Sequence, residues 1–175
     1  MGCSWLMDNQ GVAVLRFLSL AALAVWIGGL AALGGVAAPE LFAWLQAHDP
    51  VAGRETAGQL FGVIFARFQH FSWALGGVAI VSLIVRAILG PRPRRFGIRA
   101  WLLAVMLAFS VATALWITPR IEAIRDSVSG PVASLADTDA RKVTFGRLHG
   151  LSNVLMLLTI VTGLGLIWME AGDRK

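Results

Sequence analysis

Two histidines occupy matching places in the two halves of the sequence, each shortly after an arginine. His70 follows Arg67 in the first half, and His149 follows Arg147 in the second. Neutral imidazole is a common metal ligand, and helical bundles build metal sites from side chains on facing helices. One hypothesis is therefore a haem or copper site with His70 and His149 as its ligands.

The alternative is that the two histidines form hydrogen bonds to neighbouring helices and set their register. Two histidines without a nearby cysteine or carboxylate are an incomplete site for most metals, and the single cysteine is Cys3. The sequence favours this structural interpretation. We therefore expect no catalytic residue, no metal and no other cofactor.

Other polar side chains have positions that would bring them close to the histidines. Ser152 and Asn153 share a helical face with His149 by their three- and four-residue spacing. Glu40 and Arg120 occupy equivalent positions in the two halves and could pair across a bundle. The sequence thus predicts one polar cluster at the outer rim, formed by Glu40, His70, Arg120, Arg147, His149, Ser152 and Asn153.

The elements that must position these residues are long apolar segments. The 175 residues are 57% hydrophobic and 14% charged, whereas a soluble domain is about a quarter charged. Crossing about 30 Å of hydrocarbon takes about 20 residues in a helix, and only helices or closed barrels satisfy the backbone there. Four stretches qualify as membrane spans: about 14–37, 70–89, 100–118 and 149–168.

The predicted fold class is all-α: an integral membrane four-helix bundle in a single domain, residues 1–175. The two halves resemble each other as two out-and-back hairpins of equal orientation, which makes the repeat a parallel one. Apolar residues recur at helical spacing before residue 70, so helices should extend beyond the outer membrane surface.

Orientation follows from the short link at residues 90–99, which carries four arginines. Short basic loops stay in the cytoplasm. The chain should therefore be a multi-pass protein of a bacterial inner (plasma) membrane, with both termini cytoplasmic. This placement also accounts for the net charge of +5 without nucleic acid as a partner.

The middle of each span contains no Asp, Glu, Lys, Arg or His. Pumps and ion-coupled carriers usually place ionisable residues there, and hydrolases need a general base or metal ligands. Catalysis is therefore not expected.

The first span is rich in small residues at four-residue spacing, which lets helices approach closely. They either pack inside the bundle or form a dimer face. The residues concerned are Gly28, Gly29, Ala32 and Gly35.

Several segments resemble the transmembrane protein 205 family (domain of unknown function 4149). Residues 145–152, which contain His149-Gly150-Leu151-Ser152, are similar to the opening of its last helix, and residues 116–120 to its proline–arginine step. Residues 58–70 resemble its approach to the second helix, and Trp26 with Gly28-Gly29 its first. The resemblance implies a four-helix membrane protein. One member is associated with resistance to a platinum drug, which implies handling of metal complexes or their trafficking.

Three functions remain open from the sequence. The favoured one is a non-catalytic accessory subunit or assembly partner in a larger membrane complex. The first alternative is a transporter or handler of a small solute or metal complex. The second is a haem- or copper-binding protein that uses His70 and His149. The expected partners are the lipid bilayer and either other proteins or further copies of the chain.

Overall fold

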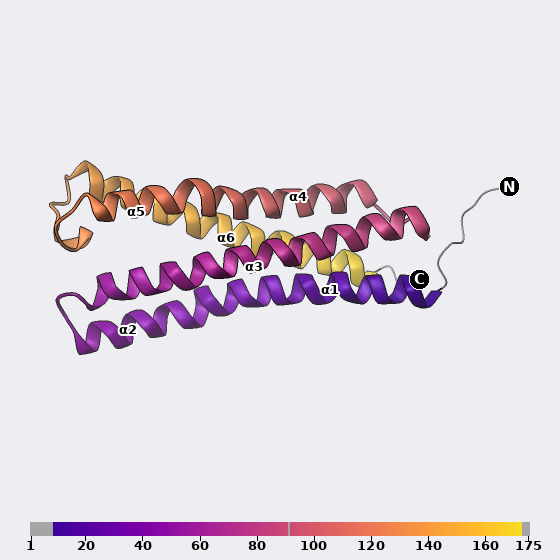
Figure 1. Ribbon diagram of the computed structural model, residues 1–175, viewed down its shortest axis with the longest axis horizontal. Helices are drawn as coiled ribbons and strands as arrows, with labels where there is room; N and C mark the ends of the chain where they lie inside the picture. The colour runs from indigo at the N-terminus through magenta and orange to yellow at the C-terminus, as the bar shows by residue number, and fades with distance from the viewer. Residues whose placement is uncertain (1–8, 91, 173–175) are drawn as a thin grey trace.

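The computed structural model describes residues 9–90 and 92–172. All regular secondary structure within these residues is helical (Figure 1). Cys3, Arg174 and Lys175 lie outside the described residues. Four continuous helical stretches are long and apolar enough to cross a membrane: Asn9–His48, Gly53–Leu89, Phe96–Asp126 and Ala140–Gly172. Each contains one of the predicted spans, so the all-α, four-helix fold class is confirmed.

The four long helices form one bundle. Helix α1 (Asn9–Ala32) packs against α3 (Gly53–Leu89) and α6 (Ala140–Gly172), and α4 (Phe96–Ala112) packs against the same two. Helices α3 and α6 therefore lie across one diagonal of the bundle. The buried core receives side chains from all four helices: Leu23, Trp26, Ile27, Leu30, Ala79, Leu83, Leu103, Met106 and Leu166.

The two halves of the chain repeat the same order of elements. Helix α1 continues through a π-helix, η1 (Leu33–Ala37), into α2 (Ala38–His48), and α3 returns. Helix α4 likewise continues through a π-helix, η2 (Thr113–Ile117), into α5 (Thr118–Asp126), and α6 returns. The matching five-residue π-helices support the parallel repeat that the sequence predicted.

A proline near the start of each outer helix explains the π-helices. Proline has no backbone N–H, and its ring clashes with the carbonyl four residues earlier. Pro39 stands in the first turn of α2, and Pro119 in the first turn of α5. The turn before each proline is widened by one residue, so the Ala38 N–H bonds the Leu33 carbonyl five residues back. The helix continues through the proline instead of breaking.

The helices are longer than a bilayer is thick. At 1.5 Å per residue, the 37 residues of α3 extend about 55 Å. We call the end of the bundle that carries α2 and α5 the outer end, and the end where α3 stops and α4 begins the inner end. About 20 residues counted outward from Arg86 on α3 and from Glu170 on α6 reach residues near 66 and 150. The earlier turns of α3 and α6, with α2 and α5, therefore project beyond the hydrocarbon.

The outer end is held by a few charged contacts. Arg125 of α5 lies 3.2 Å from the Glu55 carboxylate of α3, which ties the two hairpins together. Asp139 caps α6, because its Oδ1 accepts the Arg141 backbone N–H at 2.8 Å. The side-chain hydrogen bond from Arg141 also lowers the pKa of Asp139 to about 2. The link between α5 and α6 contains only a short 3₁₀ turn, η3 (Val132–Ser134).

Candidate functional sites

His70 lies on the exposed surface of α3 and makes its contacts within that helix. Its Nδ1 is 2.8 Å from the Ala66 carbonyl oxygen, one turn earlier. Its ring lies 4.9 Å from the Trp73 ring, centroid to centroid. These contacts fix the ring against its own helix, so His70 does not set the register of a neighbouring helix.

His149 is exposed on α6, and its ring stacks on Phe145, one turn earlier, at 6.4 Å between centroids. The charged side chains that interact electrostatically with His149 are two arginines, Arg125 and Arg54. His149 makes no ring contact or hydrogen bond with His70 among the residues that the structure describes, and their helices lie across the bundle diagonal. In the described part of the chain, no group of three or more His, Cys, Asp or Glu side chains could hold a metal ion.

The other members of the predicted outer-rim cluster do not converge either. Arg120 lies over the Trp116 ring, 4.3 Å from its centroid, and Glu40 is exposed on α2. The ion pair between the hairpins is made instead by Arg125 and Glu55. Arg147 and Asn153 are exposed, and Ser152 is half-buried against a small chamber in the bundle. Matching positions in the two halves place side chains at equal depth along the bundle. They do not make these side chains point toward one another.

The small residues of the first span also divide between two surfaces. A Cβ added at Gly29 would meet the Phe68 ring at 2.3 Å, so this glycine admits a close contact between α1 and α3. A Cβ at Gly28 or Gly35 would meet nothing within 4 Å, and Ala32 is exposed. Only Gly29 of the four is used for close packing inside the bundle.

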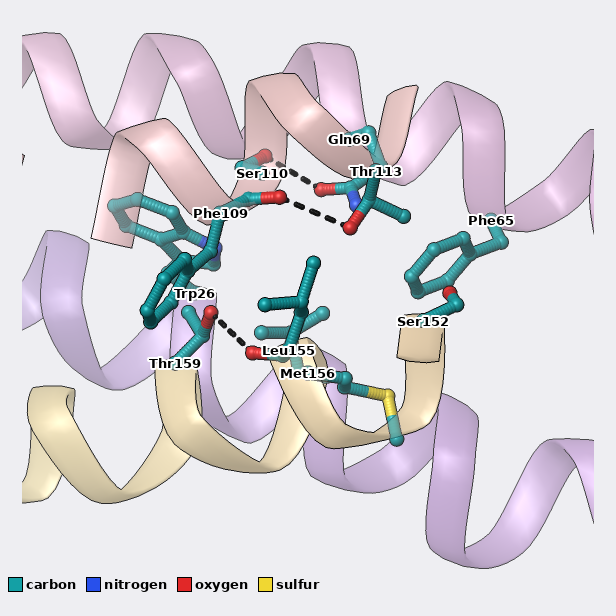
Figure 2. Close-up of a pocket in the computed structure, with 11 residues that line it drawn as sticks. Trp26, Phe65, Gln69, Phe109, Ser110, Thr113, Ser152, Leu155, Met156 and Thr159 are labelled. Atoms are coloured by element: carbon teal, nitrogen blue, oxygen red, sulfur yellow. Dashed lines mark hydrogen bonds between the residues drawn. The ribbon is translucent and has the colours of Figure 1, made fainter. Parts of the chain in front are cut away.

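A small chamber lies between the four helices in their outer half, where Figure 2 shows its lining. Its volume is about 10 Å³, close to what one water molecule needs. Polar and aromatic side chains from α1, α3, α4, η2 and α6 surround it: Trp26, Gln69, Ser110, Thr113, Ser152 and Thr159. The chamber is therefore a polar site within an otherwise apolar bundle.

Gln69 joins α3 to α4 beside this chamber. Its Oε1 accepts a hydrogen bond from the Ser110 hydroxyl at 2.7 Å (Figure 2). The Trp73 Nε1 donates to the same hydroxyl oxygen at 2.9 Å, and the Ser72 hydroxyl donates to the Gln69 carbonyl at 2.8 Å. Gln69, Ser72 and Ser110 are all buried, so this network is shielded from lipid and water.

The remaining polar groups at the chamber differ in how they are paired. Thr113 and Thr159 donate to carbonyls of their own helices, Phe109 at 2.9 Å and Leu155 at 2.8 Å. The indole Nε1 of Trp26 is buried and has no hydrogen-bond partner among the described residues. A buried donor of this kind is costly unless it is paired, and a water in the chamber would pair it.

We predict that Gln69→Leu destabilises the bundle by about 0.6–1.7 kcal/mol, because it leaves the Ser110 hydroxyl without its acceptor. Interhelical hydrogen bonds in membranes reach about 1.7 kcal/mol at most. Unfolding in mixed detergent micelles would measure the change. Gln59→Leu, at an exposed position of the same helix, is the control and should change stability by less than about 0.5 kcal/mol. Equal effects of the two substitutions would contradict a role for the network.

The inner end holds a buried ionic cluster that joins all four long helices. Glu170 of α6 is 2% exposed. Its carboxylate accepts from Arg86 Nη1 of α3 at 2.8 Å and from Arg99 Nη1 of α4 at 2.9 Å. Arg16 of α1 donates to the Glu170 and Ala171 backbone carbonyl oxygens. Side chains of α1, α3 and α4 therefore meet at Glu170 and its neighbour on α6.

None of the residues in this cluster was among the site residues predicted from the sequence. Its signal was nevertheless present: Glu170 is an acidic residue at the inner end of a span, at the depth of three arginines on the other helices. An ionisable residue at the end of a span that faces the bundle interior marks a paired site. This ionic cluster has a structural role, because both carboxylate oxygens of Glu170 are engaged by arginines.

A stripe of exposed apolar side chains runs along α3. In the membrane part it includes Val78, Val81, Ile84 and Ile88, as expected for a lipid-facing surface. The stripe continues beyond the outer boundary, where Leu60, Val63 and Ile64 are 47%, 56% and 41% exposed. Exposed Arg67 separates the two parts at the level expected for lipid headgroups.

The chain was also compared with known proteins. The family model described as "Domain of unknown function (DUF4149)" matches residues 21–128. This range covers most of the first three spanning helices, including both π-helices. No curated protein and no solved structure matches the chain.

Proposed function

Since this chain belongs to the family of the domain of unknown function DUF4149, whose description names no activity, we propose its function from the structure. The chain is a non-catalytic membrane protein that binds a protein partner through its outer end, as an accessory subunit of a larger membrane complex. The proposed contact surface, the outer α3 surface, consists of Leu60, Val63 and Ile64.

One observation carries this proposal: the exposed apolar stripe of α3 is longer than the hydrocarbon. From Leu60 to Ile88 it extends about 42 Å at 1.5 Å per residue, against about 30 Å of hydrocarbon. Lipid tails cover the inner part, and headgroups lie at Arg67. A protein partner would cover the remaining apolar turns, because large exposed apolar patches outside a membrane mark interaction sites.

The polar groups inside the bundle support a non-catalytic role. Gln69, Ser110 and Glu170 are each engaged in hydrogen bonds or ion pairs that hold helices together, and the Ser72 hydroxyl donates to the Gln69 backbone carbonyl within α3. A general base or nucleophile needs a free functional group that faces a substrate-sized space. The chamber beside Gln69 has room for about one water, which also gives the transport alternative no pathway through a single bundle.

We place the outer α3 surface on the non-cytoplasmic side of a bacterial inner membrane. The 90–99 segment at the opposite end carries four arginines in a short connection, and such segments stay in the cytoplasm. A membrane-impermeant maleimide should therefore label a cysteine placed at position 60 in intact cells, and spare one at position 94. The reverse labelling pattern would overturn this orientation.

Photo-crosslinking in the native membrane tests the partner proposal. A benzoylphenylalanine at position 64, in the outer α3 surface, should give an adduct with a distinct protein, identified by mass spectrometry. The matched control is the same probe at position 84, which lies in the lipid-facing part of the same stripe. It should give lipid adducts only.

A second pair of variants separates specific binding from chance proximity. Leu60→Ser with Ile64→Ser should remove the adduct formed by a probe at position 63, while Val81→Ser with Ile84→Ser should leave it. An adduct of twice the mass of the chain would make the surface a self-association face and contradict the accessory role. Lipid adducts alone at position 64 would contradict the partner proposal altogether.

A further inference from the structure

The inner end carries an open cavity, at the opposite end of the bundle from the proposed partner surface. It lies between the start of α4 and the end of α6 and has a volume of about 580 Å³. Its lining is strongly basic and carries one large aromatic side chain: Arg94, Arg95, Arg99, Trp168, Met169 and Gly172.

Two of the three arginines are available to a ligand. Arg99 forms the buried wall of the cavity and already bonds Glu170 and the Met169 carbonyl oxygen at 2.8 Å. Arg94 and Arg95 are exposed, and neither guanidinium has a hydrogen-bond or ion-pair partner among residues 9–90 and 92–172. An arginine guanidinium presents a planar fork of donors that fits phosphate oxygens. The side chains that line the cavity therefore favour the binding of an anion.

The backbone at the cavity adds to this positive character. Arg95 precedes the first turn of α4, where no side chain caps the free N–H groups. Those groups and the helix dipole favour an anion at this place. Arg95 also has a φ of 55°, a left-handed conformation that a non-glycine residue rarely adopts. Such conformations cluster at ligand-binding sites, where the surrounding structure maintains them.

The aromatic side chains indicate which kind of anion. Trp168 borders the cavity and is 81% exposed, and Trp101 of α4 is 64% exposed near the same level. Tryptophan is enriched at the headgroup level of membrane proteins. We therefore expect the cavity to open where lipid phosphates are found. We propose that it binds the phosphate headgroup of an anionic phospholipid, held by Arg94 and Arg95 with Trp168 against the glycerol and upper acyl region.

Native mass spectrometry of the purified full-length chain tests this proposal. The probe is a mixed micelle with equal amounts of phosphatidylglycerol and phosphatidylcholine. The wild type should retain one phosphatidylglycerol in preference to phosphatidylcholine. Arg95→Asn keeps a residue that tolerates the left-handed backbone, and it should weaken retention about fivefold, the value of one basic side chain near a lipid surface. Arg94→Gln should have a similar effect and serves if Arg95→Asn folds poorly.

Arg92→Asn is the matched control, because it removes one positive charge from the same loop. The Arg92 guanidinium lies over the Phe96 ring, 5.1 Å from its centroid, and does not line the cavity. It should change retention less than twofold. An equal loss with Arg92→Asn would show diffuse attraction and overturn the site, as would equal retention of the two lipids. Displacement of the lipid by millimolar inorganic phosphate would overturn the assignment to a lipid.

Discussion

Glu170→Gln should destabilise the bundle by about 3–5 kcal/mol, the range measured when one partner of a buried ion pair is removed. The carboxylate is the acidic group that bonds both Arg86 and Arg99, and all three side chains are at most 5% exposed. Glutamine keeps one accepting oxygen but turns an amide donor toward a guanidinium. Two buried cations would then share a neutral partner.

Reversible unfolding in mixed micelles would measure this loss. Glu122→Gln, at an exposed position of α5, removes the same charge and should change stability by less than about 0.5 kcal/mol. A double-mutant cycle adds a sharper test, because Arg86→Met should cost less in the Glu170→Gln background than in the wild type. Purely additive effects would show that the contact between Arg86 and Glu170 carries no coupling energy.

Gly163→Leu should cost about 1–3 kcal/mol, as expected for overpacking a tight interface. A Cβ at Gly163 would lie 2.4 Å from Ile27 Cδ1 and 3.0 Å from Met106 Cε. Ile27 and Met106 belong to the buried core on α1 and α4, so neither can move aside without disturbing other contacts. The added side chain would push α6 away from both helices.

Gly165 is the matched control for this prediction. It lies on the same helix two residues later, is exposed, and a Cβ there would meet nothing within 4 Å. Gly165→Leu makes the same change in helix propensity without the clash, so it separates the effect of propensity from the steric effect. We expect it to leave the unfolding free energy within about 0.5 kcal/mol of the wild type. Similar losses at both glycines would contradict close packing at Gly163.

The number of membrane-spanning helices and the repeat could be predicted from the sequence alone. These properties depend on length and local chemistry. About 20 apolar residues are needed to cross the hydrocarbon, and the backbone must be helical there. The extension of the helices beyond the outer membrane surface was also predicted, because the apolar residues before His70 keep helical spacing outside the span. The prolines of the two halves marked equivalent turns, although the π-helices that precede them were not foreseen.

Which faces of the helices meet depends on how the helices pack, and the sequence did not show this. In a soluble helix the apolar stripe marks the buried side. In a membrane, lipid and core are equally apolar, so the hydrophobic pattern does not show which way a helix is turned. His70 and His149 have matching positions in the sequence, yet they lie on helices across the bundle diagonal. Their polar neighbour Gln69, one residue from His70, turns inward and joins two helices.

The glycines and charges follow the same rule. Gly28 and Gly29 are adjacent in a small-residue pattern, but they face different directions around α1. Only Gly29 lies against Phe68. Glu170 meets Arg86 and Arg99 because three helices end at one depth with these side chains turned toward the bundle axis. The depth of a residue along the membrane normal follows from its position within the apolar segment. Rotation about each helix axis is set by packing between helices, and it selects which polar residues form a site.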